Sequence, residues 1–104
     1  MRKAVPPRPA PAAPGAESLL TPELRELLRT TTREGLEKLL RALEQRDASG
    51  ATRSAHFIKG GLALLDDPAP VQLAGTIEKA AMESDFPAAL AQTAELTAVL
   101  HRWI

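Results

Sequence analysis

The chain has 104 residues, a length that fits one domain and leaves little room for a second. Thirteen basic residues balance thirteen acidic ones, and this net charge of zero argues against nucleic-acid binding, which depends on an excess of Lys and Arg. The absence of cysteine excludes disulfides and thiolate metal sites. Hydrophobic residues make up 44% of the chain and aromatic residues only 3%, so the core must consist mainly of Leu, Ala, Ile and Val, which favours helices.

The first segment is predicted to be a linker. Residues 1–17 hold five of the nine prolines and show no apolar periodicity, a composition typical of a disordered linker. A leader left over from cloning would look the same. These prolines do not fit a signal peptide, and no apolar run approaches the roughly 20 residues that span a membrane. We therefore expect a cytoplasmic domain over residues 18–104, with no direct membrane contact.

Helical signals begin at Thr21, a capping residue followed by Pro22 at the first helical position. Leucines at helical spacing then continue as far as Leu43. Residues 30–35, which include three threonines and a glycine, interrupt them. This interruption predicts a short first helix that bends into a longer second one, ending near Arg46.

Three further helices are predicted downstream. The third covers residues 50–66, and the stretch 66–70 ends it and starts the fourth, with Pro70 in the first turn of the fourth. Ser84 and Asp85 offer an N-cap for the fifth, whose apolar face continues to the end of the chain. Short loops between amphipathic helices imply antiparallel neighbours. The predicted fold is therefore all-α: an up-and-down antiparallel four-helix bundle with a short extra N-terminal helix.

The third predicted helix carries the residues that point to a chemical function. Its apolar arc consists of Ala55, Ile58, Leu62 and Leu65, and it is widened by Phe57, Gly61 and Leu64. His56 points the other way and is expected to be exposed. Lys59, at i+3, can bring its ammonium close to a phosphoryl group on His56, and Gly60, at i+4, leaves space for that group or for a partner. Two adjacent glycines cost about 2 kcal/mol in a helix, so they indicate close approach: of another helix at Gly61 and of a partner at Gly60.

Each of these features alone has an ordinary explanation. A single histidine on a helix is usually a solvated surface residue, a single lysine a surface charge, and a pair of glycines a packing contact. The combination of an exposed histidine, a lysine at i+3 and a glycine at i+4 in a central helix favours a functional role for His56.

The stretch from Ala55 to Gly60 resembles the A-H-x-[apolar]-K-G core of histidine phosphotransfer (HPt) domains. Further likeness lies at Leu62, Leu64, Leu65, Pro68, Gln72, Leu73, Thr76, Ile77 and Glu78, which resemble the C-terminal HPt domains of Rcs-, Evg- and Bvg-type hybrid sensor kinases. The resemblance covers roughly residues 20–104. It departs at residues 66–68, where many members have a glycine, and at Gly61, where Ser, Ala or Thr is common. Both departures leave the choice of receiver open.

The resemblance implies that His56 accepts a phosphoryl group on Nε2, that Lys59 supports the group and that Gly60 gives steric access. The domain would take the group from a receiver aspartate and pass it to a response-regulator receiver. It would act as a phosphoryl carrier without enzymatic activity, cofactor or metal of its own, since Mg²⁺ is expected on the receiver. We expect a cytoplasmic monomer, including as the C-terminal domain of an inner-membrane hybrid sensor kinase.

Two alternatives remain open at this point. One is a helical docking or dimerisation module in which His56 is incidental, and the other is the phosphoacceptor domain of a chemotaxis-type kinase. Glu78 and Glu83 are predicted to face solvent and not to act as a catalytic pair. His101 is assigned to the end of the last helix, where a cation is favoured, and Trp103 to a hydrophobic plug at the bundle end.

Overall fold

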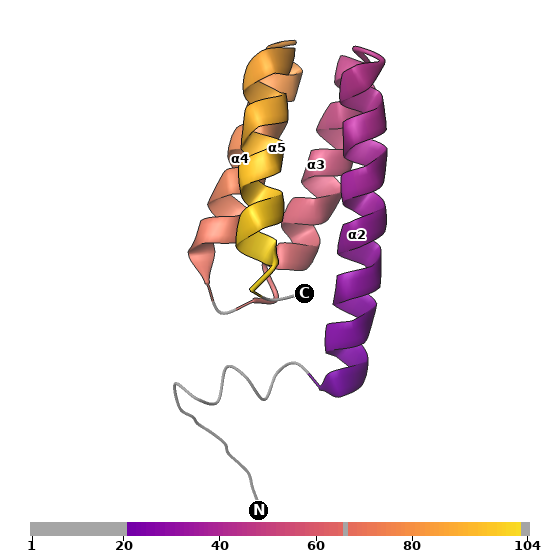
Figure 1. Cartoon of the computed structure of the whole chain (residues 1–104), viewed down its shortest axis with the longest axis vertical. Coiled ribbons are helices and arrows are strands. Elements are labelled where there is room, and N and C mark those ends of the chain that lie inside the picture. The colour runs from indigo at the N-terminus through magenta and orange to yellow at the C-terminus, as the bar shows by residue number, and fades with distance from the viewer. Residues whose placement is uncertain (1–20, 66, 103–104) are drawn as a thin grey trace, which may run out of the picture.

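The computed structural model describes residues 21–65 and 67–102. This part of the chain contains no strand and four helices, which are α2 (Pro22–Glu44), α3 (Ala48–Leu62), α4 (Pro68–Met82) and α5 (Phe86–Leu100) (Figure 1). The predicted all-helical class is therefore confirmed. The predicted linker over residues 1–17 and the predicted plug, Trp103, lie outside the described residues, so both stay predictions.

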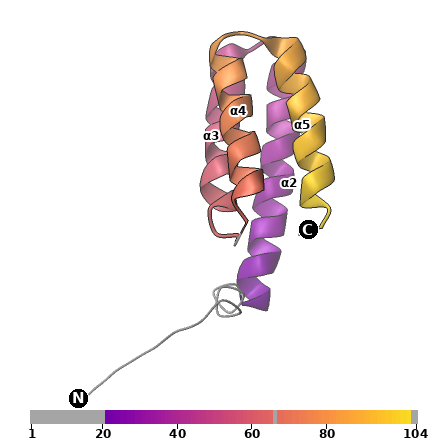
Figure 2. The same cartoon turned by 90° about the vertical axis from the view of Figure 1, so that its left-hand side faces the viewer.

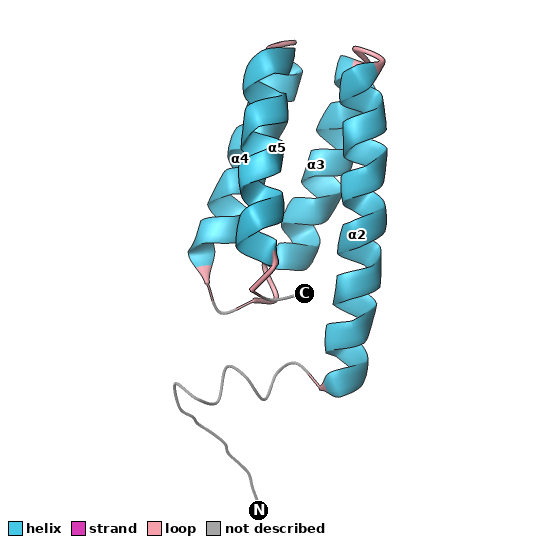
Figure 3. Cartoon of the chain, viewed as in Figure 1, coloured by secondary structure: helices cyan, strands magenta, loops and turns pink. Residues whose placement is uncertain are grey.

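The four helices form an up-and-down bundle. Each helix packs against the next one in the chain, and α2 also contacts α5, which closes the bundle. The α2–α3 and α4–α5 turns lie together at one end, and the α3–α4 connection lies at the other (Figures 1 and 2). Only short loops join the helices (Figure 3). The largest fully buried side chains are Leu39, Leu43, Ile58, Leu62, Ile77, Leu96, Leu100, Thr93 and Pro70. With so few aromatic residues, the core is aliphatic, and alanines fill the spaces between the helices.

Side-chain caps fix where the helices begin. The hydroxyl of Thr21 accepts a hydrogen bond from the Leu24 backbone N–H at 3.1 Å, as predicted. An aspartate caps each of the other three helices, namely Asp47, Asp67 and Asp85. The predicted bounds of α3 were wrong at both ends, since the helix begins at Ala48 and ends at Leu62. It begins earlier because the Asp47 carboxylate accepts from the Gly50 N–H at 3.0 Å, which places Ala48 in the first turn.

The two turns at one end of the bundle have the same geometry. Arg46 and Ser84 both adopt the left-handed region, with φ of 55° and 57°. Around Arg46, the Asp47 N–H donates to the Ala42 carbonyl at 2.8 Å, and the turn at Ser84 repeats this bond. This is the Schellman arrangement, which satisfies carbonyls at a helix C-terminus. The next residue after each turn is the aspartate cap, so α2–α3 and α4–α5 reverse direction within three residues.

The predicted bend in the first helical stretch is absent. α2 runs without interruption from Pro22 to Glu44, and Thr32 and Gly35 belong to its buried stripe. The Thr31 hydroxyl donates to the Leu28 carbonyl at 3.2 Å, so this threonine is accommodated inside the helix. The short extra N-terminal helix predicted before this bend is therefore not a separate element, because its residues form the first turns of α2.

Gly35 is required by the packing of α2 on α3. A Cβ atom added at Gly35 would lie 2.8 Å from Cγ1 of Ile58, a side chain that is only 1% exposed. The glycine therefore lets α2 and α3 approach closely at Ile58. This residue lies two positions after His56 and one before Lys59 in α3.

We predict that Gly35→Ala destabilises the fold by about 1 kcal/mol, because the clash with Ile58 outweighs the higher helix propensity of alanine. Gly60→Ala is the matched control. It meets no atom within 4 Å and should stabilise the fold by up to about 1 kcal/mol. Urea unfolding followed by circular dichroism measures both, and equal stabilisation by the two variants would contradict the assigned role of Gly35.

Candidate functional site

The outer face of α3 presents His56 to solvent. Ala51, Ala55, Ile58 and Leu62 are buried in the bundle, and the His56 side chain is 69% exposed, as predicted. The predicted apolar arc was too wide. Phe57 and Leu64 are 61% and 57% exposed, because only the narrow stripe around Ile58 faces the other helices.

A carboxylate from the neighbouring helix holds the imidazole. Oε2 of Glu78, on α4, lies 3.0 Å from Nδ1 of His56, and Oε1 of the same carboxylate accepts from Nζ of Lys59 at 2.6 Å. The Glu78 side chain is only 18% exposed. The prediction that Glu78 faces solvent was therefore wrong, whereas Glu83 is exposed as expected. The structure thus joins His56 and Lys59 through a third residue that sequence reasoning assigned to the surface.

The position of Glu78 depends on the register between α3 and α4. Ile77 is fully buried in the bundle core, and the next residue is turned toward α3. The aliphatic stem of Lys59 passes beside Gly75, one turn earlier on α4, where a Cβ atom would lie 3.8 Å from Lys59 Cδ. A side chain beginning at residue 75 would make only an ordinary van der Waals contact with the lysine, so the path of Lys59 does not itself require a glycine there.

The charge of Glu78 is stabilised by its two partners. The hydrogen bond from Lys59 lowers the pKa of this carboxyl below its ordinary value of 4.5, and the hydrogen bond with His56 lowers it further. Partial burial acts in the opposite direction and is outweighed. Glu78 is therefore ionised at neutral pH and can only accept hydrogen bonds.

This contact determines which ring nitrogen of His56 carries the proton. A carboxylate that only accepts requires a hydrogen on Nδ1, so the neutral imidazole keeps its lone pair on Nε2. The arrangement of His56 and Glu78 therefore presents a nucleophilic nitrogen on an exposed side chain.

The two adjacent glycines of α3 differ in their surroundings. No atom lies within 4 Å of a Cβ built on Gly60, so the space one turn after His56 is open. A Cβ on Gly61 would lie 3.3 Å from Cδ1 of Leu28, on α2. The predicted helix approach at Gly61 is thus observed, and Gly60 leaves room for a partner.

The other histidine has different surroundings. His101 is the C-cap of α5, as predicted, and it lies beside Arg33, Leu36, Thr97 and Leu100 at the end of the bundle. In the part of the chain that the structure describes, no group of three or more His, Cys, Asp or Glu side chains could hold a metal ion. No helix among residues 21–65 and 67–102 is long and apolar enough to cross a membrane.

Comparison with known families identifies the class. The family described as "Hpt domain" matches residues 23–103, which is most of the chain. The chain therefore belongs to the Hpt family, and it is a histidine phosphotransfer domain. Such domains are phosphocarrier modules of phosphorelays, and their partners are receiver domains of two-component signalling. Searches of curated proteins and of solved structures gave no match.

We predict that Glu78→Gln lowers the free energy of unfolding at neutral pH and that this loss fades in acid. A carboxyl whose pKa is lowered in the folded state contributes stability above its ordinary value of 4.5, and this stability is lost as the pH falls through the folded value. Urea unfolding of both proteins at about pH 7 and about pH 3 measures the difference. Glu83→Gln, which changes an exposed carboxylate at the end of the same helix, is the control. A loss on Glu78→Gln that does not depend on pH would contradict the ion pair.

Proposed function

We propose that His56 is the residue that carries the phosphoryl group, accepting it on Nε2 from a receiver aspartate and passing it to a response-regulator receiver. The observation that supports this most directly is the contact between Nδ1 of His56 and the Glu78 carboxylate at 3.0 Å on an otherwise exposed side chain. It provides a nucleophile with the correct tautomer and an open approach.

The transfer step follows from this tautomer. The Nε2 lone pair attacks the phosphorus of the aspartyl phosphate, an N–P bond forms, and the bond from phosphorus to the carboxylate oxygen breaks, so that the aspartate leaves as an anion. The imidazole ring then carries a positive charge with its proton still on Nδ1. The Glu78 carboxylate at that proton stabilises the charge, and the reverse reaction uses the same atoms.

Lys59 makes the carboxylate compatible with an incoming phosphate. A bare carboxylate beside His56 would repel a phosphoryl group, whereas the Lys59 ammonium at 2.6 Å balances its charge. The Lys59 side chain is 34% exposed and lies one turn from His56, so its ammonium also supports the phosphoryl oxygens after transfer. Gly60, with open space above it, gives the receiver access to this group.

The receiver supplies the remaining chemistry. Its aspartate and Mg²⁺ position and neutralise the phosphate, so the domain itself needs neither a cofactor nor a metal. The likeness of residues 62–78 to C-terminal HPt domains of Rcs-, Evg- and Bvg-type proteins supports placing this domain, with residues 1–17 as its linker, in a cytoplasmic part of a hybrid sensor kinase.

We predict that the wild-type domain becomes labelled when it is mixed with phosphorylated receiver domains and that His56→Gln does not. The label should be acid-labile and alkali-stable, as expected of a phosphoramidate bond. His101→Gln is the matched control, because it removes the other histidine at the far end of α5 and should label normally.

Chemical labelling with phosphoramidate, which needs no partner protein, checks the same residue independently. Equal labelling of wild type and His56→Gln by either donor would exclude His56 as the acceptor. Absence of labelling from every donor would favour the docking-module alternative.

A second prediction concerns Glu78 as a positioning residue. Glu78→Ala should shift the neutral His56 ring from the Nδ1–H toward the Nε2–H tautomer and slow phosphotransfer by about tenfold or more. Long-range ¹H–¹⁵N NMR of the imidazole reads the tautomer directly, and a purely structural role would not move it. Lys59→Ala is the control for the tautomer measurement. It removes the ammonium that donates to Glu78 and leaves the carboxylate that accepts from Nδ1 of His56. An unchanged tautomer in Glu78→Ala would rule out this role.

A further inference from the structure

The Glu78 carboxylate faces the ring nitrogen of His56 that phosphorylation leaves free. Phosphorus bonds to Nε2, whereas Nδ1, on the other side of the ring, lies 3.0 Å from Oε2 of Glu78. The phosphorylated ring is positively charged only while Nδ1 holds a proton. The carboxylate is therefore placed beside the one proton that determines the charge of the phosphorylated ring.

That proton decides how readily the phosphoryl group leaves. When a receiver aspartate or a water molecule attacks the phosphorus, the N–P bond breaks and its electron pair goes to Nε2. With a proton on Nδ1, the ring leaves as a neutral imidazole. Without that proton, the ring has to leave as an imidazolate anion, which is a much poorer leaving group. A phosphorylated histidine that has lost its Nδ1 proton is therefore a poor phosphoryl donor.

Glu78 is held in place by contacts other than the one with His56. Its Oε1 accepts from Nζ of Lys59 at 2.6 Å, and its side chain is only 18% exposed. The hydrogen bond from Lys59 holds the pKa of the Glu78 carboxyl below its ordinary value, so this group is ionised throughout the pH range in which histidine rings titrate. A fixed negative charge at hydrogen-bond distance favours the protonated form of the ring beside it.

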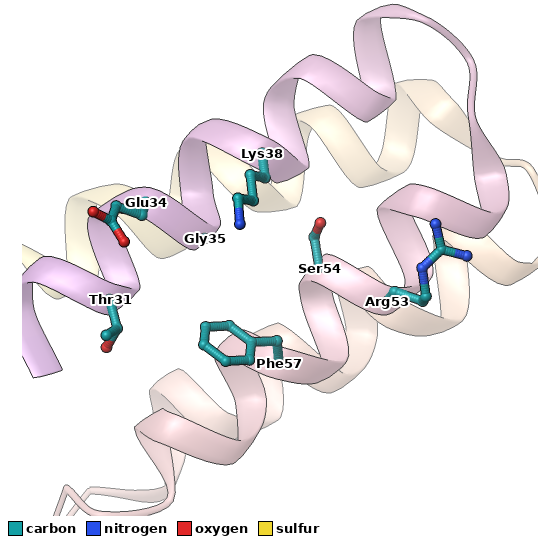
Figure 4. A pocket seen from close by; sticks show the side chains of 7 residues that line it. All are labelled: Thr31, Glu34, Gly35, Lys38, Arg53, Ser54 and Phe57. Atoms are coloured by element: carbon teal, nitrogen blue, oxygen red, sulfur yellow. The ribbon is translucent and has the colours of Figure 1, made fainter.

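The other charged groups around this part of α3 have different positions. On α3 itself, the Lys59 ammonium is paired with Glu78, and Arg53 donates to a serine hydroxyl of its own helix at 2.6 Å. On α2, Glu34 and Lys38 line a hollow of about 220 Å³, and Figure 4 shows them across the α2–α3 seam from Arg53. From α4, the carboxylate of Glu78 contacts the imidazole directly. Among the described residues, the ion-pair partner of the ring is therefore an anion.

We propose that Glu78 keeps the phosphorylated His56 ring protonated at neutral and mildly alkaline pH, so that the domain remains an active phosphoryl donor and does not store the group. This inference rests on the proposed phosphotransfer at His56 and concerns the regulation of that site, namely the lifetime of the phosphohistidine. Glu78 is a positioning residue in this role, because it acts through Nδ1 and does not touch the phosphoryl group.

The charge of Glu78 carries this effect, and its hydrogen bond alone does not. A glutamine side chain has the same shape, but its amide can turn, so that it either accepts from a protonated Nδ1 or donates to a bare one. It therefore gives the protonated ring no electrostatic preference. Glu78→Gln separates the charge of the residue from its contact with the ring.

The test follows the phosphorylated domain without any receiver. Wild type, Glu78→Gln and Glu83→Gln are phosphorylated with phosphoramidate and freed of it, and loss of the phosphoryl group is followed by ³¹P NMR. At about pH 8.5, we expect wild type to lose the group about tenfold or more faster than Glu78→Gln, because a neighbouring opposite charge shifts a protonation equilibrium by that factor. At about pH 5.5 the two should be alike, since the ring is protonated in both. Glu83→Gln, which changes an exposed carboxylate at the end of α4, should follow wild type.

A second readout observes the proton itself. The ¹⁵N chemical shift of Nδ1 in the phosphorylated domain changes when the ring loses its proton, and this change should occur at a lower pH in Glu78→Gln than in wild type. Free histidine phosphorylated on Nε2 is a reference that needs no variant to fold. The wild-type domain should keep its Nδ1 proton to a higher pH than this compound does.

The outcomes distinguish this inference from the proposed function. If wild type and Glu78→Gln lose the group with the same pH dependence, or if Glu78→Gln is slower by the same factor at every pH, Glu78 does not hold the proton. The inference is then wrong, while His56 stands as the phosphoryl carrier. A wild-type Nδ1 that loses its proton at the same pH as the free compound has the same meaning. If phosphoramidate labels His56→Gln as strongly as wild type, the proposed function and this inference are both wrong.

Discussion

The carboxylate of Glu78 ties the chemistry of this domain to its packing. It bridges α3 and α4, with one oxygen at 3.0 Å from His56 and the other at 2.6 Å from Lys59. An exposed histidine on a helix would otherwise rotate freely and exchange its proton between two nitrogens. The bundle prevents this by fixing the register of α4 through the burial of Ile77, so that the orientation of one surface ring depends on the aliphatic core. A change in helix packing far from the surface is therefore able to alter the reactivity of His56.

The glycines of the two central helices show how small residues serve different purposes at neighbouring positions. Gly35 is needed because Ile58 fills the space where a side chain would begin, and a Cβ atom on Gly61 would lie in close contact with the Leu28 side chain, at 3.3 Å from Cδ1. Gly60 has no such neighbour, so the fold alone would tolerate alanine there and even gain helix propensity. A residue that lowers stability without a packing reason is best explained by the need to admit a partner.

Much of the fold was predictable from local signals. The caps at Thr21 and Asp85, and the buried positions of Ala55, Ile58 and Leu62, follow from short-range chemistry and helical periodicity. The bend expected at residues 30–35 was wrong. Threonine and glycine have low helix propensity on their own, but here Thr32 and Gly35 belong to the buried face of α2, where tertiary contacts stabilise the helix. The site was predictable only in part for a similar reason. His56, Lys59 and Gly60 share one helix and a recognisable spacing, whereas Glu78 joins them from another helix, and its position depends on a packing register that periodicity cannot supply.

The two sides of α3 differ in the contacts that their side chains make. On the α4 side, Glu78 and Lys59 set the state of the imidazole, and these contacts are internal to the chain. On the α2 side, Phe57 and the cations Lys38 and Arg53 are exposed and have no ion-pair partner within the described residues. Among the described residues, the hydrogen bond of the His56 ring is to Glu78 on the α4 side, and Arg53 on the other side donates to Ser49 within its own helix at 2.6 Å.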